Sequence, residues 1–453
     1  MAAKNLSQLL TYHVVSLSSL MPASVCSTPA QGSKSLSGLL EVTHKYGPCS
    51  PLKQGNAKIP SLRQILIDDQ TRVNSIHSKF SNQQSPVAGS KLKLPANSGI
   101  SLGTGEFIVR IGFGTPKKDF TVVFDTGSDL TWIQCLPCTI QCFLQQDPYF
   151  NPSASSTYSN IQCGSAACSQ VKSATGYSPS CTTDCIYQAA YNDGSTTEGY
   201  FSTDTLTLSS SAIFPNFKFG CGENNQAPLL LGSADGLLGL GRDPISIVSQ
   251  TAQKYGKLFS YCLPSTTSST GFLTFGSQAG ASSSSLQYTP LLINSDRPDY
   301  YYITMTGISV EGQLLSIPES VFRTSGTIID SGTVISRLAP TAYSALRLAF
   351  RLAMSKYPAT ASPYSLYDTC YDFSGYTSVQ LPSIVLHLGG GTDLNVDESG
   401  ILYHATSSVY CLAFSANDAD TDLGILGNNQ QKRFEVVYNV AGGKLGFGAG
   451  ACS

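Results

Sequence analysis

The chain has 453 residues and a mass of 48.0 kDa, too long for one compact core, so two domains or one large two-lobed protein are expected. Hydrophobic residues make up 41% and charged residues 12%, and the 41 Gly and 23 Pro favour a turn-rich, mostly β globular protein over a coiled coil or a disordered chain. The formal net charge of −2 argues against a generally basic, nucleic-acid-binding surface.

The first residues are typical of a targeting segment. Residues 1–27 contain Lys4, a moderately apolar stretch up to Val25 and small residues near its end, which predicts a secretory signal peptide; an acid-poor, Ser-rich organellar transit peptide is the alternative. No window is apolar for long enough to span a bilayer, so no membrane association is expected. The apolar spacing from Pro60 to Phe80 predicts an amphipathic helix, and residues 81–104 have the composition of an exposed, cleavable connection.

Charge is distributed unevenly along the chain. Residues 1–94 contain ten Lys and Arg against three acids, a charge of +7, whereas residues 95–453 carry −9. A basic nucleic-acid arm is one interpretation, but its charges would form a run, and these are scattered. The pattern favours a cationic front segment that accompanies an acidic body.

The remaining chain alternates short β-rich runs with Gly, Asn, Asp and Pro from Glu106 onward. Two helices are predicted there, Ile245–Tyr255 after Pro244 and Thr341–Lys356 after Pro340. Strands therefore dominate the body.

Fourteen cysteines are present, two in the front segment and twelve in the body, and seven of the twelve crowd between Cys135 and Cys185. The Cys135-Leu-Pro-Cys138 spacing would suit a zinc knuckle, but no His lies in that stretch and an exported chain favours disulfides. We therefore expect no metal and up to six body disulfides, although spacing alone leaves their pairing open.

The most informative feature is an internal repeat. The segment FTVVFDTGS, residues 120–128, has the same character as GTIIDSGT, residues 326–333: an apolar strand that ends in Asp, followed by a hydroxyl residue, Gly and a second hydroxyl residue. Each copy is followed by a Leu-Leu-Gly or Ile-Leu-Gly triplet, at residues 237–239 and 425–427. One supersecondary unit is thus used twice.

Two such turns related by a pseudo-twofold axis would bring Asp125 and Asp330 face to face. Neighbouring carboxylates cannot both ionise freely, so the pair would share a proton, and one could act as base while the other acts as acid on a water molecule between them. Each triplet alone would be interpreted as an ordinary turn, because Asp and Gly favour turns. The repetition after apolar strands favours the catalytic interpretation.

With these motifs the sequence resembles the pepsin-like aspartic proteases from about Glu106 to Gly448. The resemblance implies a mostly β, bilobal fold with pseudo-twofold related lobes, in which Asp125 and Asp330 are catalytic. It also implies a flap with Tyr191, Asn192 and Asp193, in which Trp132 is the partner of Tyr191. The implied active-site support consists of Thr126, Gly127, Ser128, Ser331, Gly332 and Thr333, with the inner hydroxyls gripping each other and the outer ones bonded to the carboxylates.

More narrowly, the cysteine-rich segment is similar to that of the plant nepenthesin-like branch. This resemblance implies a propeptide at residues 28–94, an N-terminal catalytic lobe at 95–294 and a C-terminal lobe at 295–453. It also implies six disulfides: Cys135–Cys138, Cys142–Cys221, Cys163–Cys185, Cys168–Cys181, Cys262–Cys452 and Cys370–Cys411.

The expected protein is an aspartic endopeptidase that hydrolyses polypeptides at acid pH, is made as a proenzyme and needs no cofactor. Its partners would be polypeptide substrates and its own propeptide, and it would be a monomer, secreted or vacuolar, or alternatively chloroplastic. The cationic propeptide would block the acidic cleft at neutral pH, or would only assist folding. The alternative function is a catalytically silent member of the same fold that binds or inhibits a foreign hydrolase.

Overall fold

The computed structural model describes residues 12–21, 23–27, 39–52, 61–81, 107–138, 140–191, 195–226, 231, 233–280, 282–283, 285–362, 364 and 366–452. The fold is mostly β, as the composition predicts. The described helices are α1 (Leu17–Leu20), α2 (Leu62–Ser81), α3 (Ala166–Ser169), α4 (Val171–Thr175), α5 (Ile247–Gln250), α6 (Ala252–Tyr255), α7 (Glu319–Ser325), α8 (Pro340–Ala353) and α9 (Glu398–Ile401).

One large sheet contains the strands of the N-terminal half and is completed by strands from both ends of the chain. A front-segment strand, β2, lies inside this sheet between β13 and β3. Strands β29 and β30, from the end of the chain, lie with β14 at one edge. Its strands are β2 (Leu39–His44), β3 (Phe107–Phe113), β4 (Lys118–Asp125), β5 (Trp132–Gln134), β6 (Ser159–Asn160), β7 (Ser180–Cys181), β8 (Cys185–Ala190), β9 (Thr196–Ser209), β10 (Ala212–Gln226), β11 (Gly236–Gly239), β12 (Leu258–Cys262), β13 (Thr270–Phe275), β14 (Gln287–Pro290), β29 (Glu435–Asn439) and β30 (Lys444–Gly448).

The C-terminal half is built from smaller sheets. One contains β15 (Tyr302–Ile303), β18 (Thr327–Ile329), β19 (Ser336–Leu338), β27 (Phe414–Ala416) and β28 (Gly424–Leu426). A second contains β16 (Met305–Val310), β17 (Gln313–Leu314), β23 (Ile384–Leu388) and β24 (Thr392–Asn395). The others contain β20 (Ala359–Thr360), β21 (Cys370–Asp372), β25 (Leu402–His404) and β26 (Val409–Leu412), and the pair β1 (Tyr12–Ser16) and β22 (Ser378–Pro382).

Two of the three predicted helices are confirmed, and the body also contains short helices that were not predicted: α3, α4, α7 and α9. The front helix is confirmed as α2, and α8 begins at Pro340, whose fixed φ and missing N–H suit the first helical position. The helix predicted at Ile245–Tyr255 is instead two short helices, α5 and α6. The break lies at Thr251, which has a φ of −97° and a ψ of 7°.

The disulfides correct four of the expected pairs. Cys262–Cys452 and Cys370–Cys411 are formed as expected, but Cys135–Cys138, Cys142–Cys221, Cys163–Cys185 and Cys168–Cys181 are wrong. The structure pairs Cys135–Cys221, Cys138–Cys142, Cys163–Cys181 and Cys168–Cys185, and it adds Cys26–Cys49 in the front segment. The physical reason is that β5 and β10 run side by side in parallel, with Ile133 opposite Cys221. Cys135 directly follows β5, and its Cα lies 5.4 Å from that of Cys221, within disulfide reach. The Cys135-Leu-Pro-Cys138 pair therefore cannot be a zinc knuckle.

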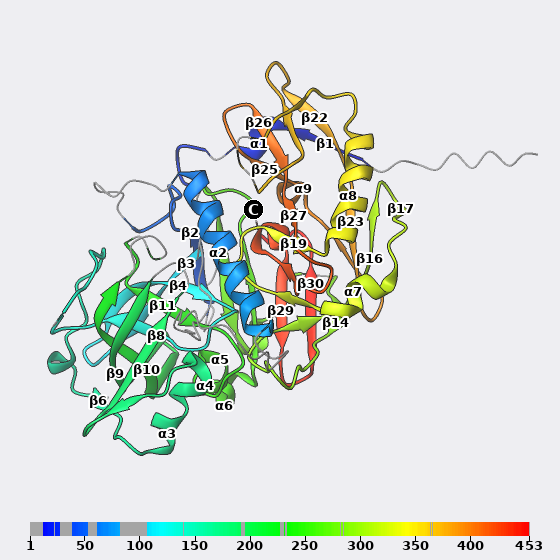
Figure 1. Ribbon diagram of the computed structural model, residues 1–453. Helices are drawn as coiled ribbons and strands as arrows, with labels where there is room; N and C mark the ends of the chain where they lie inside the picture. The colour runs from blue at the N-terminus through cyan, green and yellow to red at the C-terminus, as the bar shows by residue number, and fades with distance from the viewer. Residues whose placement is uncertain are drawn as a thin grey trace, which may run out of the picture.

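Helix α2 lies across the junction between the large sheet and the C-terminal sheets (Figure 1). The first turns of α2 pack through Leu66 against Val334 and Ile335, and its later turns pack through Val73 and Ile76 against strands β15, β18 and β28. Every helix in the described ranges is too short or too polar to cross a membrane. Helix α2 is thus packed into the fold, and its middle turns lie over the repeated Asp motifs.

Candidate active site

Both copies of the repeated motif have the same local structure. Strand β4 ends at Asp125, and β11 runs parallel to it with Leu238 opposite Phe124. Strand β18 leads to Asp330, and β28 runs parallel to it with Leu426 opposite Ile329. Each aliphatic-aliphatic-Gly triplet therefore supports the strand that delivers an Asp, which accounts for the repeat in the sequence.

The two aspartates meet on one cation. Nη2 of Arg72, from α2, donates to Oδ1 of Asp125 at 2.9 Å and to Oδ1 of Asp330 at 2.7 Å, and Nε of Arg72 donates to Oδ2 of Asp330 at 2.8 Å. All three side chains are buried. Because a single nitrogen bonds both carboxylates, the two acids lie close enough to act on one small molecule.

The inner hydroxyl residues link the two motifs. The N–H of Thr126 donates to Oγ of Ser331 at 3.1 Å, and the N–H of Ser331 donates to Oγ1 of Thr126 at 2.9 Å. The two hydroxyl oxygens are 3.3 Å apart. This reciprocal contact agrees with the expected grip, and it fixes the two Asp turns relative to each other.

The outer hydroxyls differ from each other. Oγ1 of Thr333 donates to Oδ2 of Asp330 at 2.6 Å, as expected. Ser128 lies near Asp125 and lowers the pKa of its carboxyl. Among the described residues, however, the Oγ atom of Ser128 and the Oδ2 atom of Asp125 each have no hydrogen-bond partner. The two carboxylates are thus held unequally in the presence of Arg72.

The motif glycines are required because of close approach. A Cβ at residue 127 would lie 2.5 Å from Nη2 of Arg72 and 2.8 Å from Oδ1 of Asp330, and a Cβ at residue 332 would lie 2.4 Å from the guanidinium. The N–H groups of Gly127 and Gly332 also donate to Oδ1 of Asp125 and Oδ1 of Asp330, at 3.0 and 3.2 Å. Any side chain at either position would fill the space in which the acids meet the cation.

Electrostatics distinguish the members of the cluster. Burial raises the pKa of Asp125, the charge of Arg72 opposes this rise, and the charge of Asp330 adds to it. Burial alone would lower the pKa of Arg72, but the charges of Asp125 and Asp330 outweigh burial and raise it. Arg72 therefore remains a cation, and a proton that enters the cluster goes to a carboxylate.

A second ion pair lies one helical turn away. Asp69 accepts from Nη2 of Arg337 at 2.9 Å and from the N–H groups of Val334 and Ile335 at 2.6 and 3.3 Å. The side chains of Asp69 and Arg337 are both 0% exposed.

Sequence reasoning missed Arg72, Asp69 and Arg337, although one signal was available for the first two. At helical spacing, Asp69 and Arg72 follow Ile65 and Leu66 on the apolar stripe of α2. Charged residues on a buried face need partners, so a cation and an anion on this stripe indicate ionic contacts with the surface underneath.

The flap residues are partly described. Nε1 of Trp132 donates to the Tyr191 hydroxyl at 2.7 Å, and the rings stack with centroids 6.4 Å apart. The N–H of Tyr191 donates to the carbonyl of Ser195 at 2.7 Å, which closes the hairpin. Asn192 and Asp193 lie outside the described residues.

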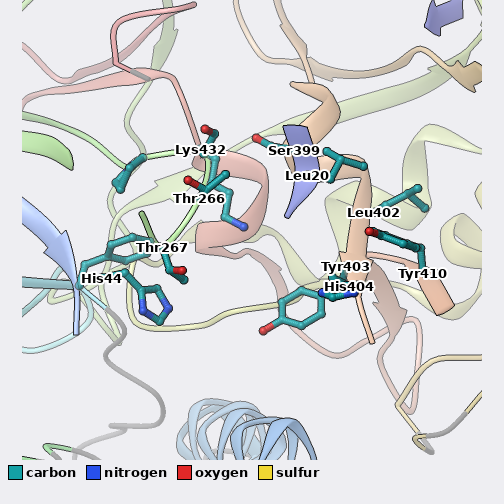
Figure 2. A pocket seen from close by; sticks show the side chains of 13 residues that line it. Leu20, His44, Thr266, Thr267, Ser399, Leu402, Tyr403, His404, Tyr410 and Lys432 are labelled. Atoms are coloured by element: carbon teal, nitrogen blue, oxygen red, sulfur yellow. The ribbon is translucent and has the colours of Figure 1, made fainter. Parts of the chain in front are cut away.

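The front segment borders a pocket elsewhere on the molecule (Figure 2). Its volume is about 180 Å³, and its lining includes Leu20 and His44 from the front segment and His404, Tyr410 and Lys432 from the body. Its lining contains no carboxylate, so it lacks the acid pair that the repeated motifs supply.

Comparisons with known proteins agree with this geometry. Family models described as xylanase inhibitor N-terminal and xylanase inhibitor C-terminal match residues 107–277 and 300–449. An aspartyl protease family protein of Arabidopsis thaliana is 48% identical over 97% of this chain and 93% of its own length. Aspartic proteinase nepenthesin-2 of Nepenthes gracilis is 40% identical over 77% of this chain and 79% of its own length.

Solved structures support the fold. Basic 7S globulin from soybean has a TM-score of 0.60 at 23% identity and covers 76% of this chain and 93% of its own. A structure titled edgp has a TM-score of 0.60 at 20% identity over 76% of this chain and 91% of its own. From the long matches to aspartyl proteases and the paired Asp motifs, the chain belongs to the pepsin-like aspartic protease family, among plant members that include the nepenthesins.

Proposed function

We propose that this protein is an aspartic endopeptidase, made as a proenzyme, that hydrolyses peptide bonds of polypeptides at acid pH. The observation that carries the proposal is the meeting of Asp125 and Asp330 on one nitrogen of Arg72. Two buried carboxylates within reach of one small group are the arrangement that activates water without a metal.

In the proposed mechanism, a water molecule takes the place of Nη2 of Arg72 after the helix leaves. The two carboxylates then share one proton, as in aspartic proteases generally. The ionised carboxylate removes a proton from the water, whose oxygen attacks the peptide carbonyl carbon, while the protonated carboxyl gives its proton to the carbonyl oxygen. The tetrahedral diol collapses when the C–N bond breaks: the carboxyl that took the proton from water gives it to the leaving nitrogen, and a hydroxyl of the diol returns its proton to the other carboxylate.

The surrounding residues would hold this geometry. The contacts between Thr126 and Ser331 fix the relative position of the two acids, and the N–H groups of Gly127 and Gly332 orient a carboxylate oxygen on each side. Preorganised donors of this kind need no rearrangement during the reaction. Tyr191, held by Trp132, is the proposed flap residue over the bound polypeptide.

We further propose that the front segment up to residue 94 is a propeptide that blocks the site through α2. Its start moves from the expected residue 28 to Cys26 or earlier, because Cys26 is joined to Cys49. Arg72 occupies the position that we assign to the water, so no hydrolysis can begin while α2 is docked. Protonation of Asp125 removes a negative charge that Arg72 binds, so a fall in pH weakens the contact that holds α2. Release is therefore favoured as the pH falls.

The proposed location is a secretory or vacuolar one. All fourteen cysteines are joined in disulfides, which form and persist in oxidising compartments. The proposed partners are polypeptide substrates and the chain's own propeptide.

A catalytically silent binding protein is the second candidate. The names of the matching family models refer to xylanase inhibitors, and one structural neighbour is named as a globulin. Fold alone does not decide between them. The intact acids, glycines and linking hydroxyls favour the peptidase, because together they form the arrangement that can activate water.

The test is acid treatment of the recombinant full-length chain, followed by digestion of a peptide library. We expect cleavage that Asp125→Asn and Asp330→Asn each abolish. Cleavage that survives Asp125→Asn would contradict the mechanism. The binding candidate would be favoured if the wild-type chain lost α2 in acid, cleaved no peptide and bound a xylanase.

A further inference from the structure

We propose that Val334, Ile335 and Arg337 form a carboxylate-binding site in the cleft, which selects substrates with an acidic side chain near the cleaved bond. This inference rests on the proposed peptidase function and adds a substrate class to it. In the structure described here, the site is occupied by Asp69 of α2.

The first argument is the number and type of donors. Oδ1 of Asp69 accepts from the N–H of Val334 at 2.6 Å, while Oδ2 accepts from the N–H of Ile335 at 3.3 Å and from Nη2 of Arg337 at 2.9 Å. Two backbone N–H groups and one guanidinium thus surround a single carboxylate. Charge-assisted contacts of this kind are among the stronger hydrogen bonds in proteins.

The second argument is that the donors belong to the body and are fixed there. Val334 and Ile335 follow the Asp330 motif directly, and Nη1 of Arg337 donates to the carbonyl of Ile335 at 3.1 Å, which holds the guanidinium in place. The side chain of Arg337 is 0% exposed, and its Nε has no hydrogen-bond partner in the described part of the chain. The site therefore persists when its present occupant leaves.

The third argument is the consequence of that departure. When α2 leaves, Arg337 loses the carboxylate of Asp69, and a carboxylate of a bound substrate can take its place on the same donors. Asp69 and Arg72 are three residues apart on a helix, which corresponds to about 4.5 Å along its axis. The carboxylate site therefore lies beside the catalytic pair, within reach of side chains of a polypeptide that occupies the cleft in place of α2.

The experiment uses acid-treated full-length chain and capped decapeptides at pH 5, where a free Glu side chain with a pKa of about 4.3 is mostly ionised. A single Glu is moved through the positions on both sides of the cleaved bond, and each peptide is matched by one with Gln. We expect kcat/KM to be about tenfold higher or more for Glu than for Gln at one position. The Glu-to-Gln ratio should fall to about one in Arg337→Gln and be partly retained in Arg337→Lys.

The control variant is Arg323→Gln, which removes an exposed arginine of α7 that pairs with Glu319 and should leave the ratio unchanged. If Arg337→Gln fails to fold, the wild-type ratio and Arg337→Lys still decide. A ratio within about twofold of one at every position, or an unchanged ratio in Arg337→Gln, would overturn the proposal.

Failure of the proposed function is distinguishable from failure of this inference. Hydrolysis of the Gln peptides without preference for Glu would contradict the carboxylate site and leave the peptidase intact. If no peptide is cleaved, the same ratio is measured as binding, by fluorescence anisotropy of labelled peptides whose central bond is reduced. Tighter binding of the Glu peptide, lost in Arg337→Gln, would then support the site although the peptidase proposal had failed.

Discussion

Removal of the charge of Arg72 should loosen α2 far more than removal of another arginine from the same helix. Arg72→Met keeps an unbranched side chain but deletes three charge-assisted hydrogen bonds to buried carboxylates. Breaking a buried ion cluster by removal of one partner costs about 3–5 kcal/mol. At about 1.4 kcal/mol per factor of ten, the opening equilibrium of α2 should increase between about 100-fold and about 4,000-fold.

Amide hydrogen exchange at pH 7 measures this opening directly, because the helix amides exchange only when α2 undocks and unfolds. The matched control is Arg63→Met, because Arg63 is exposed in the first turn of α2; for this variant we expect less than a threefold change. Exchange in β4 and β18 should change little in either variant. Similar exchange of α2 in Arg72→Met and Arg63→Met would refute the view that the ion cluster holds the helix.

The effect should also depend on pH. With Arg72 present, protonation of Asp125 weakens the contact that holds α2, so we expect acid to accelerate the exchange of α2 in the wild-type chain. In Arg72→Met the two carboxylates can already share a proton while α2 is docked, so the same acidification should accelerate exchange much less. An equal pH dependence in the two proteins would contradict the proposed coupling.

Three further outcomes are expected. Trp132→Phe removes the indole N–H that donates to the buried hydroxyl of Tyr191 at 2.7 Å, so the free energy of unfolding should fall by about 1–3 kcal/mol. Denaturant unfolding measures this change, and an unchanged free energy of unfolding would contradict a stabilising role for the hydrogen bond. Burial raises the pKa of Asp235 to about 8, so the folded state favours the protonated form. The free energy of unfolding should therefore fall as the pH rises from 4 to 8, by at most about 1.4 kcal/mol per pH unit. Asp235→Asn should make the free energy of unfolding less dependent on pH, and an unchanged dependence would contradict the pKa shift. Because Cys26 pairs with Cys49, N-terminal sequencing of the exported proenzyme should find that the chain starts at or before Cys26. If the chain instead starts at residue 28 and iodoacetamide labels the thiol of Cys49, this disulfide does not form.

Much of the active site could be predicted because its residues lie close together in the sequence and form a recognisable pattern. Asp125 and Asp330 each end an apolar strand, and the hydroxyl and glycine neighbours follow at fixed positions, so the chemistry of each turn is contained in a few consecutive residues. The repetition then implied a twofold arrangement. The structure agrees in the parallel pairing of β11 with β4 and of β28 with β18.

The disulfide pairing could not be predicted in the same way. The cysteines between residues 135 and 185 are so close in sequence that many pairings are sterically possible for an unfolded chain. The choice depends on strand register: β5 runs beside β10, which selects Cys221 for Cys135 and leaves Cys138 for Cys142. Register is a property of the folded sheet and is absent from the spacing.

The sequence by itself determined a mostly β chain with two equivalent Asp turns and an amphipathic front helix, because these features depend on periodicity and on neighbouring residues. Only the tertiary structure decided that this helix lies on the carboxylate pair, with Arg72 between the acids and Asp69 on Arg337. These contacts join residues more than 50 and more than 250 positions apart. Each contact forms between charged groups that are removed from water when α2 packs against the body. The partner of such a buried charge is therefore decided only when the two segments that carry the charges pack against each other.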